Sequence, residues 1–204
     1  NIARTRFVFE ELLVLQLALR ERRAKNIENK GKTFADVKCI RDLTASMPFE
    51  LTGAQKRTIN EICRDCMSGK QMNRLVQGDV GSGKTAVAAA AIFMAVKNGY
   101  QAAMMAPTEI LASQHASSLG ELFETHGIKT AFLSGSTKAK EKREILAKIA
   151  AGVVQVVIGT HALIQENVEF KNLGFVVADE QHRFGVEQRA KLMAKGENPH
   201  MLIM

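Results

Sequence analysis

The chain has 204 residues, of which 46% are hydrophobic and 24% charged, with only three prolines. These proportions exclude an intrinsically disordered or fibrous chain and are sufficient for one full α/β domain with a helical extension. The formal net charge of +7 describes a mildly basic protein, and a basic balance favours a polyanionic partner.

The N-terminal part, residues 1–47, is predicted to consist of a helix and a linker. Apolar residues spaced three and four apart, among them Leu13 and Leu17, predict one long helix over residues 6–28. Its apolar run is shorter than the ~20 residues that span a bilayer, and it lacks the features of a signal peptide. We therefore predict a buried helix that packs on another element, no membrane contact, and a weakly periodic linker over residues 31–46.

The remaining residues, 48–204, alternate between helical patterns and short apolar strands. Strands that alternate with helices predict βαβ units, and strands without strict polar alternation have both faces covered by helices. The predicted fold class is α/β, with a mostly parallel sheet flanked by helices, and a short helical piece near Ala162. The predicted helices span residues 54–68, 84–97, 109–126, 138–150 and 186–194, and the predicted strands residues 74–77, 101–106, 130–134, 154–160, 175–179 and 201–204. The last strand ends the chain without a turn or cap, which we interpret as a fragment of a longer protein.

The chain has three cysteines, an odd number, so no disulfide framework is implied. This favours a reducing, cytoplasmic location. Cys63 and Cys66 have the spacing of a metal-binding pair. No second cysteine or histidine pair lies nearby to complete four ligands, so we interpret them as half-buried thiols of a helix.

A glycine-rich loop follows the strand at residues 74–77. It matches the pattern G-x-x-x-x-G-K-[ST], whose backbone N–H groups surround phosphate oxygens at the positive end of a helix. Lys84 is expected to reach the β- and γ-phosphates of ATP, and the Thr85 hydroxyl to bind Mg²⁺. A plain glycine turn would leave both residues unexplained. The predicted nucleotide-binding positions of this loop are Gly78, Asp79, Val80, Gly81, Ser82, Gly83, Lys84, Thr85 and Ala86.

Two acidic residues end the predicted strand at residues 175–179. Ligands of open α/β sheets bind at the carboxyl ends of the strands, so Asp179 is expected to hold Mg²⁺ and Glu180 to orient or deprotonate the attacking water. Alone, the pair is equally typical of the acidic first turn of a helix. Its combination with the glycine loop favours hydrolysis of ATP.

The segments "QGDVGSGKT", "MAPTEILASQH", "IGTHALIQ" and "DEQHRFGVEQR" together resemble the first motor domain of superfamily 2 helicases, and within them most closely the RecG family of branch-migrating DNA helicases. The resemblance covers residues 49–204, and the leading "FEELLVLQLALRERR" is similar to the helix that precedes the RecG motor. It implies a RecA-like P-loop domain that uses ATP and Mg²⁺ to remodel branched or forked DNA in recombination and repair, as a cytoplasmic monomer.

The resemblance also implies roles for individual residues. Phe49 and Gln55 correspond to an adenine-sensing motif, although Thr52 capping an ordinary helix is the alternative. Gln181 and His182 are expected to relay the nucleotide state to a second motor domain, whereas a lone histidine is more often structural. The positions implied in DNA binding, each of which is also compatible with a plain turn, are Pro107, Thr108, Ser134, Gly135, Thr160 and His161.

The same resemblance implies partners within a full-length chain, namely a second RecA-like domain that supplies arginines to the ATP site and a wedge domain that recognises branched DNA. The sequence ends before the family's Ser/Thr-Ala-Thr motif, so we expect residues 1–204 alone to hydrolyse ATP very slowly. The alternatives are the transcription-repair coupling translocase or the helicase PriA, a P-loop small-molecule kinase, and a nucleotide-gated binding module without turnover.

Overall fold

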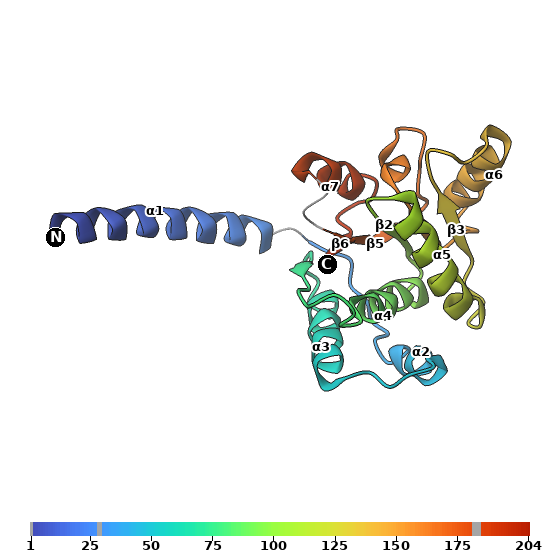
Figure 1. The fold of residues 1–204 in the computed structure, drawn as a ribbon, viewed down its shortest axis with the longest axis horizontal. Coiled ribbons are helices and arrows are strands. Elements are labelled where there is room, and N and C mark those ends of the chain that lie inside the picture. The colour runs from blue at the N-terminus through green and yellow to red at the C-terminus, as the bar shows by residue number, and fades with distance from the viewer. Residues whose placement is uncertain (1, 28–29, 181–184) are drawn as a thin grey trace.

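The computed structural model describes residues 2–27, 30–180 and 185–204, which form a six-stranded sheet with helices on both faces and one long helix outside it (Figure 1). Every strand pair is parallel, and the strand order is β1-β6-β5-β2-β4-β3. The predicted α/β class with a parallel sheet is confirmed. The strands are β1 (Asn73–Leu75), β2 (Gln101–Met105), β3 (Thr130–Leu133), β4 (Val156–Gly159), β5 (Leu173–Ala178) and β6 (His200–Ile203).

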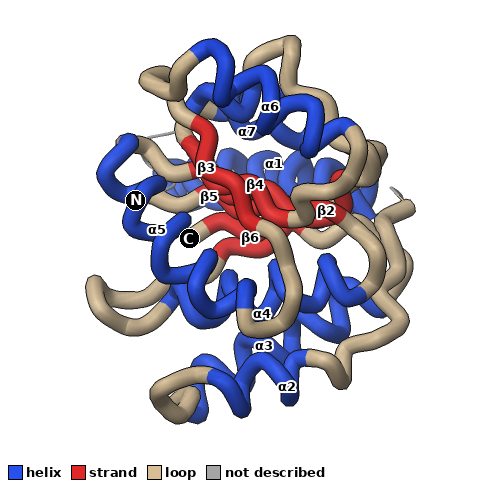
Figure 2. Tube along the Cα trace, turned by 90° about the vertical axis from the view of Figure 1, so that its right-hand side faces the viewer, coloured by secondary structure: helices blue, strands red, loops and turns tan. Residues whose placement is uncertain are grey.

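Helices cover both faces of this sheet, as the predicted strands required (Figure 2). Alternate strand residues enter two separate cores, because successive side chains of a strand point to opposite faces. Met104 joins the core under α2 (Ile40–Ser46), α3 (Gly53–Met67), α4 (Lys84–Lys97) and α5 (Glu109–Glu124), whereas Met105 joins the core under α6 (Ala139–Ala150), the 3₁₀ helix η1 (His161–Ile164) and α7 (Val186–Met193).

Helix α4 is central, as its composition indicates. All ten residues from Ala86 to Ala95 are buried, since α4 packs on the sheet on one side and on α3 and α2 on the other. A helix that is apolar all round is stable only inside such a layer. The phosphate-loop candidate precedes α4 directly, so its position is fixed by the best-buried helix of the domain.

Helix α1 (Ile2–Ile27) extends away from the sheet and its covering helices (Figure 1). The prediction of a buried helix is wrong for its described side chains, because Phe7 is 68%, Phe9 63% and Leu12 55% exposed. The sequence pattern correctly indicates a helix with many apolar residues, but it does not indicate whether another element packs on them. No helix of the described residues is long and apolar enough to cross a bilayer.

The predicted linker, residues 31–46, contains the short helix α2. The Asp36 carboxylate accepts hydrogen bonds from the N–H groups of Lys38 and Cys39 just before the helix begins. Only Ile40 and Leu43 of its seven residues are buried. Two apolar positions in two turns give too weak a period to be recognised, which explains why the helix was not predicted.

The two cysteines of α3 are structural. Cys63 and Cys66 are buried, more deeply than the half-buried state expected of them, and burial raises the pKa of both thiols. The described residues contain no group of three or more histidine, cysteine or acidic side chains that could hold a metal ion.

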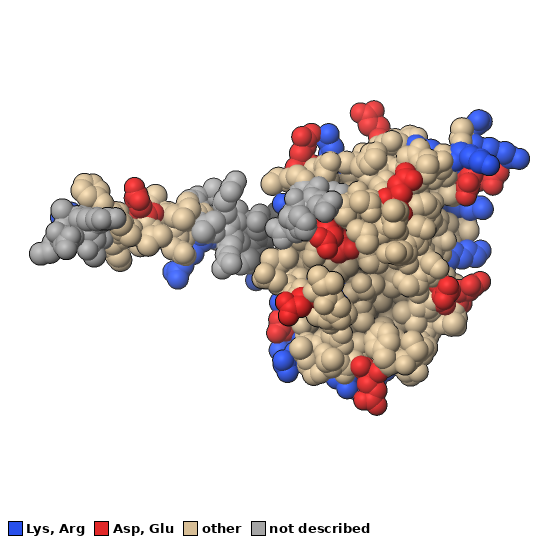
Figure 3. Space-filling model, in the orientation of Figure 1, with Lys and Arg blue, Asp and Glu red and all other residues tan. Residues whose placement is uncertain are grey.

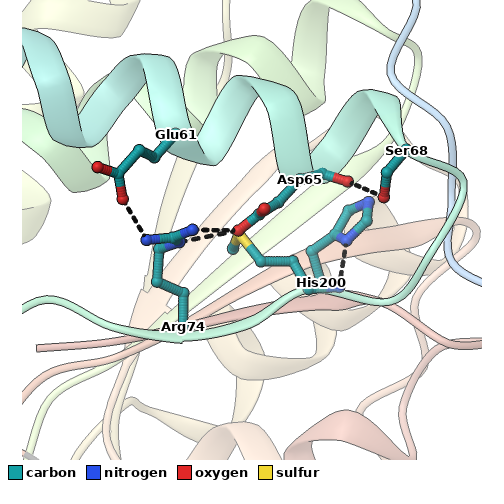
Figure 4. Close-up of polar contacts among 6 residues, drawn as sticks. Glu61, Asp65, Ser68, Arg74 and His200 are labelled. Carbon is teal, nitrogen blue, oxygen red and sulfur yellow. Dashed lines mark hydrogen bonds and ion pairs between the residues drawn. The ribbon is translucent and has the colours of Figure 1, made fainter. Parts of the chain in front are cut away.

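Polar contacts connect α3 to the edge of the sheet (Figure 4). The Arg74 guanidinium on β1 donates to Glu61 at 2.6 Å and to Asp65 at 2.8 Å, and both carboxylates lie on α3. Next to this cluster His200 of β6 is fully buried, and its Nδ1 accepts from the Met72 N–H at 3.0 Å while its Nε2 donates to the Lys32 carbonyl. His200 therefore connects β6 to the residue that precedes β1 and to the segment before α2.

His200 predicts a loss of stability in acid. Burial lowers its pKa below the ordinary 6.5, against the opposing effect of the Lys32 carbonyl. Between the lowered value and 6.5 the unfolded chain binds more protons, so the free energy of unfolding falls as the pH drops below about 6.5, by up to about 1.4 kcal/mol per pH unit for this one group. Urea unfolding at pH 7.5 and pH 5.5 measures this loss.

The control is His200→Gln, whose amide can still accept and donate but does not titrate. We expect this variant to be less stable at pH 7.5 and to lose less stability on acidification than the unmodified protein. Equal losses in the two proteins would show that the pH dependence arises elsewhere.

Candidate functional site

The carboxyl ends of all six strands lie level at one edge of the sheet. In register, Met105 pairs with both Ala178 and Gly159, Gly159 pairs with Leu133, and Ala178 pairs with Ile203. The hydrogen bonds from Asp179 N to Met105 O and from Ala106 N to Gly159 O continue the ladder into the loops. This edge therefore collects the loops that carry nearly every predicted site residue.

The glycine loop lies between β1 and α4 at this edge. The Lys84 ammonium donates to the carbonyls of Gly78 and Asp79 at 2.8 and 3.0 Å, so the loop is folded around the lysine. Gly81 and Gly83 have φ angles of +80° and +77°, a conformation that glycine adopts without strain. Val80 is fully exposed at the tip, and Thr85 lies half-buried in the first turn of α4.

Gln55 connects this loop to the start of α3. Its Oε1 accepts from the Thr52 N–H while Thr52 accepts from the Gln55 N–H, which is a complete capping box. Its Nε2 donates to the carbonyls of Ser82 and Gly83 at 3.0 and 3.4 Å. A Cβ on Gly83 would collide with this nitrogen. The helix-cap alternative is therefore present, together with a contact to the phosphate loop that the sequence did not reveal.

A cavity of about 360 Å³ opens beside the glycine loop. Its lining includes Gly78, Val80 and Lys84 from the loop, Glu180 from the end of β5, and Met204 after β6. The two predicted halves of the nucleotide site thus face the same space. Phe49 instead lines a second cavity, of about 760 Å³, between α2 and the start of α3.

Asp179 follows β5 and is held at both carboxylate oxygens. Oδ1 accepts from the Glu180 N–H at 3.0 Å, and Oδ2 accepts from Nε2 of His115 at 2.8 Å. Glu180 has a φ of +58°, which turns the chain sharply after the strand. His115 was not predicted as a site residue. It stands in the quoted "ASQH", but a single sequence does not indicate that it meets a carboxylate 64 residues away.

The predicted DNA positions follow β2, β3 and β4. Thr108 is exposed and caps α5 by accepting from the Leu111 N–H, and Gly135 and His161 are exposed as well. Ser134 and Thr160 are buried inside their loops, so their hydroxyls do not face solvent. Pro107 precedes Thr108 and is half-buried. All six predicted DNA positions thus lie in the segments that follow the strands at the carboxyl edge of the sheet.

Glu109 connects two of these loops. Its carboxylate accepts from the N–H and the hydroxyl of Ser136 at 3.2 and 2.8 Å, and these bonds hold the pKa of Glu109 below its usual range. Figure 3 shows the molecule from the same side as Figure 1: apart from a few acidic side chains the middle of this view is uncharged, and lysine and arginine side chains gather near α6. Gln181 and His182 lie outside the described residues.

Residues 52–199 match the family model of the DEAD/DEAH box helicase. The chain is 52% identical to the ATP-dependent DNA helicase RecG of Bacillus subtilis (strain 168) over 207 aligned residues and 50% identical to that of Thermotoga maritima over 203. These alignments include 100% and 99% of the chain but only 30% and 26% of the relatives. The chain therefore spans less than a third of the length of these curated relatives.

Solved structures agree with this assignment. A structure of RecG bound to a three-way DNA junction superposes with a TM-score of 0.84 at 48% identity, covering 96% of this chain and 26% of that one. The DEAD-box helicase Mss116 bound to ssRNA shares the fold alone, with a TM-score of 0.64 at 22% identity over 80% of this chain and 37% of that one. With the sheet order, the glycine loop and the Asp-Glu pair in place, the chain belongs to the DEAD/DEAH box helicase family.

Proposed function

We propose that the chain is the first motor domain of an ATP-dependent DNA helicase that remodels branched or forked DNA. The observation that carries the proposal is the arrangement of the carboxyl edge. The glycine loop, Lys84, Asp179 and Glu180 lie at the β1-β6-β5 side, and the exposed Thr108, Gly135 and His161 at the adjoining β2-β4-β3 side. About 50% identity to RecG helicases over the whole chain supports the choice of DNA as substrate.

The residues of the nucleotide half suit a bound triphosphate. Lys84 already binds two carbonyl oxygens, and the same donors would bind the β- and γ-phosphate oxygens of ATP. The positive end of the long buried helix α4 lies under the loop and favours the same charges. Glu180 faces the cavity beside the loop, where it would orient the water that attacks the γ-phosphate.

The donor set fits Mg²⁺. A cation of this kind prefers hard oxygen ligands and usually binds to one or two carboxylates together with substrate phosphates and water. Asp179 supplies a carboxylate, Thr85 supplies a hydroxyl, and the described residues contain no larger metal-binding group that would favour another ion. When bound, Mg²⁺ would neutralise charge on the phosphates. Residues Thr85 and Asp179 would hold it.

DNA contact would go through the exposed groups at the other half of the edge. The N-terminus of α5 beside Thr108 is suited to a phosphate, and the backbone of Gly135 and the His161 side chain lie at the ends of the neighbouring strands. We assign the buried Ser134 and Thr160 to shaping these loops. Gln181 and His182 are proposed to relay the nucleotide state to a second motor domain, and Phe49 and Gln55 to contact adenine.

The proposal extends to the whole protein, since the relatives are more than three times as long as this chain. A second RecA-like domain would complete the ATP site, a wedge domain would recognise the branch, and the protein would act as a monomer in the cytoplasm. The transcription-repair coupling translocase is the competing assignment. Membership of a helicase family argues against the small-molecule kinase.

Removing the charge of Lys84 or of Asp179 should remove most of the ATP turnover. In the intact protein, we expect Lys84→Ala and Asp179→Asn each to lower DNA-stimulated ATP turnover by about 100-fold or more, because each removes a charge aimed at the phosphates or the metal. A phosphate-release assay with and without forked DNA measures the effect.

Lys97→Ala is the matched control, since Lys97 lies at the other end of α4, roughly 20 Å from Lys84 by the helical rise, with its ammonium over the Phe93 ring. This variant should retain turnover. Nearly unchanged turnover in Lys84→Ala would contradict the proposed site.

A substitution at Gln55 can separate its role in the capping box of α3 from its contact with the glycine loop. Gln55→Glu keeps the side-chain acceptor of the capping box but places a carboxylate against the Ser82 and Gly83 carbonyls. We expect ATP affinity to fall about tenfold while the melting temperature changes little. Fluorescent nucleotide binding and thermal unfolding measure the two effects. A clear drop in the melting temperature, with ATP affinity unchanged, would assign Gln55 to the helix cap alone. A loss of affinity for adenine nucleotides, with the affinity for other nucleotides unchanged, would indicate that Gln55 contacts the base.

A further inference from the structure

His115 lies at the carboxyl edge of the sheet, between the nucleotide side and the side proposed to contact DNA. It lies on the buried face of α5, between Ala112 and Leu119, which are both buried. Its Nε2 lies 2.8 Å from Oδ2 of Asp179, and each of the two side chains is only 13% exposed. A contact so shielded from solvent is screened less by water and salt than an ion pair on the surface.

The contact fixes the orientation of the carboxylate. A carboxylate oxygen accepts hydrogen bonds, so Nε2 of His115 donates to Oδ2 while the Glu180 N–H donates to Oδ1. Among the described residues each oxygen accepts one hydrogen bond, which leaves each of them a second lone pair for a metal or for its water shell. Two bonds from two different elements, α5 and the turn after β5, therefore orient the carboxylate without occupying all of its acceptor positions.

The N-terminal end of the same helix contacts a loop that is proposed to bind DNA. Thr108 caps α5, and Glu109 in its first turn accepts two hydrogen bonds from Ser136 in the loop after β3. Glu109 and His115 are six residues apart, roughly 9 Å along the helix axis. If DNA at the N-terminus of α5 shifted this helix, the imidazole that binds Asp179 would shift with it.

We propose that His115 is a positioning residue, which holds the Asp179 carboxylate in the orientation required for Mg²⁺ and transmits the position of α5 to the nucleotide site. The inference rests on the proposed function, because it takes Asp179 as a metal ligand and α5 as a DNA contact. Partners that orient metal ligands typically change metal affinity by 10- to 100-fold when they are removed.

The first test is equilibrium binding of the fluorescent nucleotide mant-ADP to the intact protein during a titration with MgCl₂. We expect His115→Ala to raise the Mg²⁺ concentration at half-maximal binding by about tenfold or more. His115→Gln should restore it to within about threefold, since the glutamine amide can donate near the position of Nε2. His126→Ala is the matched control, because His126 follows the same helix but bonds to Ser46, and it should leave the midpoint unchanged.

The second test measures the linkage between DNA and nucleotide. The ratio of the mant-ADP dissociation constants with and without forked DNA is the coupling factor, and the effect is reciprocal by thermodynamic necessity. In His115→Ala we expect this ratio to fall towards one, and in His115→Gln and His126→Ala to stay at the unmodified value. A purely structural role of His115 would lower stability without changing the ratio.

The outcomes separate this inference from the proposed function on which it rests. If Asp179→Asn raises the Mg²⁺ midpoint but His115→Ala leaves both the midpoint and the coupling factor unchanged, the role of His115 is overturned and the metal site stands. If Asp179→Asn itself has no effect on the midpoint, the proposed site is wrong and the role of His115 is overturned with it. Failure of His115→Gln to restore the midpoint would overturn positioning through the hydrogen bond.

Discussion

The structure depends on the parallel register of six strands that end at the same level. Hydrogen bonds beyond the strand ends, such as Asp179 N to Met105 O and Thr160 N to Leu133 O, keep the following loops in that register. Gly159 permits the close approach of β4 and β3, because a Cβ at this position would collide with the Leu133 carbonyl. The positions of the loop residues at this edge therefore depend on the register of the strands.

Two kinds of chemistry share this edge. The nucleotide half is built around a buried helix, α4, and a loop that its own lysine holds in shape. The other half consists of a capped helix end and exposed loop residues, which in the proposed function would contact DNA. Because β5 and β2 are neighbours in the sheet, Asp179 and the start of α5 come within reach of one another, and His115 makes the direct contact. One helix, α5, therefore contacts both halves of the edge.

Most of the fold was predictable from the sequence, because it depends on local signals. Apolar strands, the all-apolar α4 and the glycine-lysine pattern each determine their own structure, and the neighbouring Asp179 and Glu180 follow from the end of a strand. What depends on distant partners was not predictable. The burial of α1 was predicted wrongly, α2 has too few buried positions to form a visible period, and the contacts of Gln55 with Ser82 and of His115 with Asp179 join segments 27 and 64 residues apart.

The most direct measurement of the central claim is a crystal structure of the intact protein with Mg²⁺ and a non-hydrolysable ATP analogue. The account predicts that the Lys84 ammonium leaves the Gly78 and Asp79 carbonyls for the β- and γ-phosphates. It also predicts that Thr85 at the start of α4 and Asp179 after β5 both face the metal. A triphosphate bound elsewhere, with Lys84 still on the two carbonyls, would contradict it.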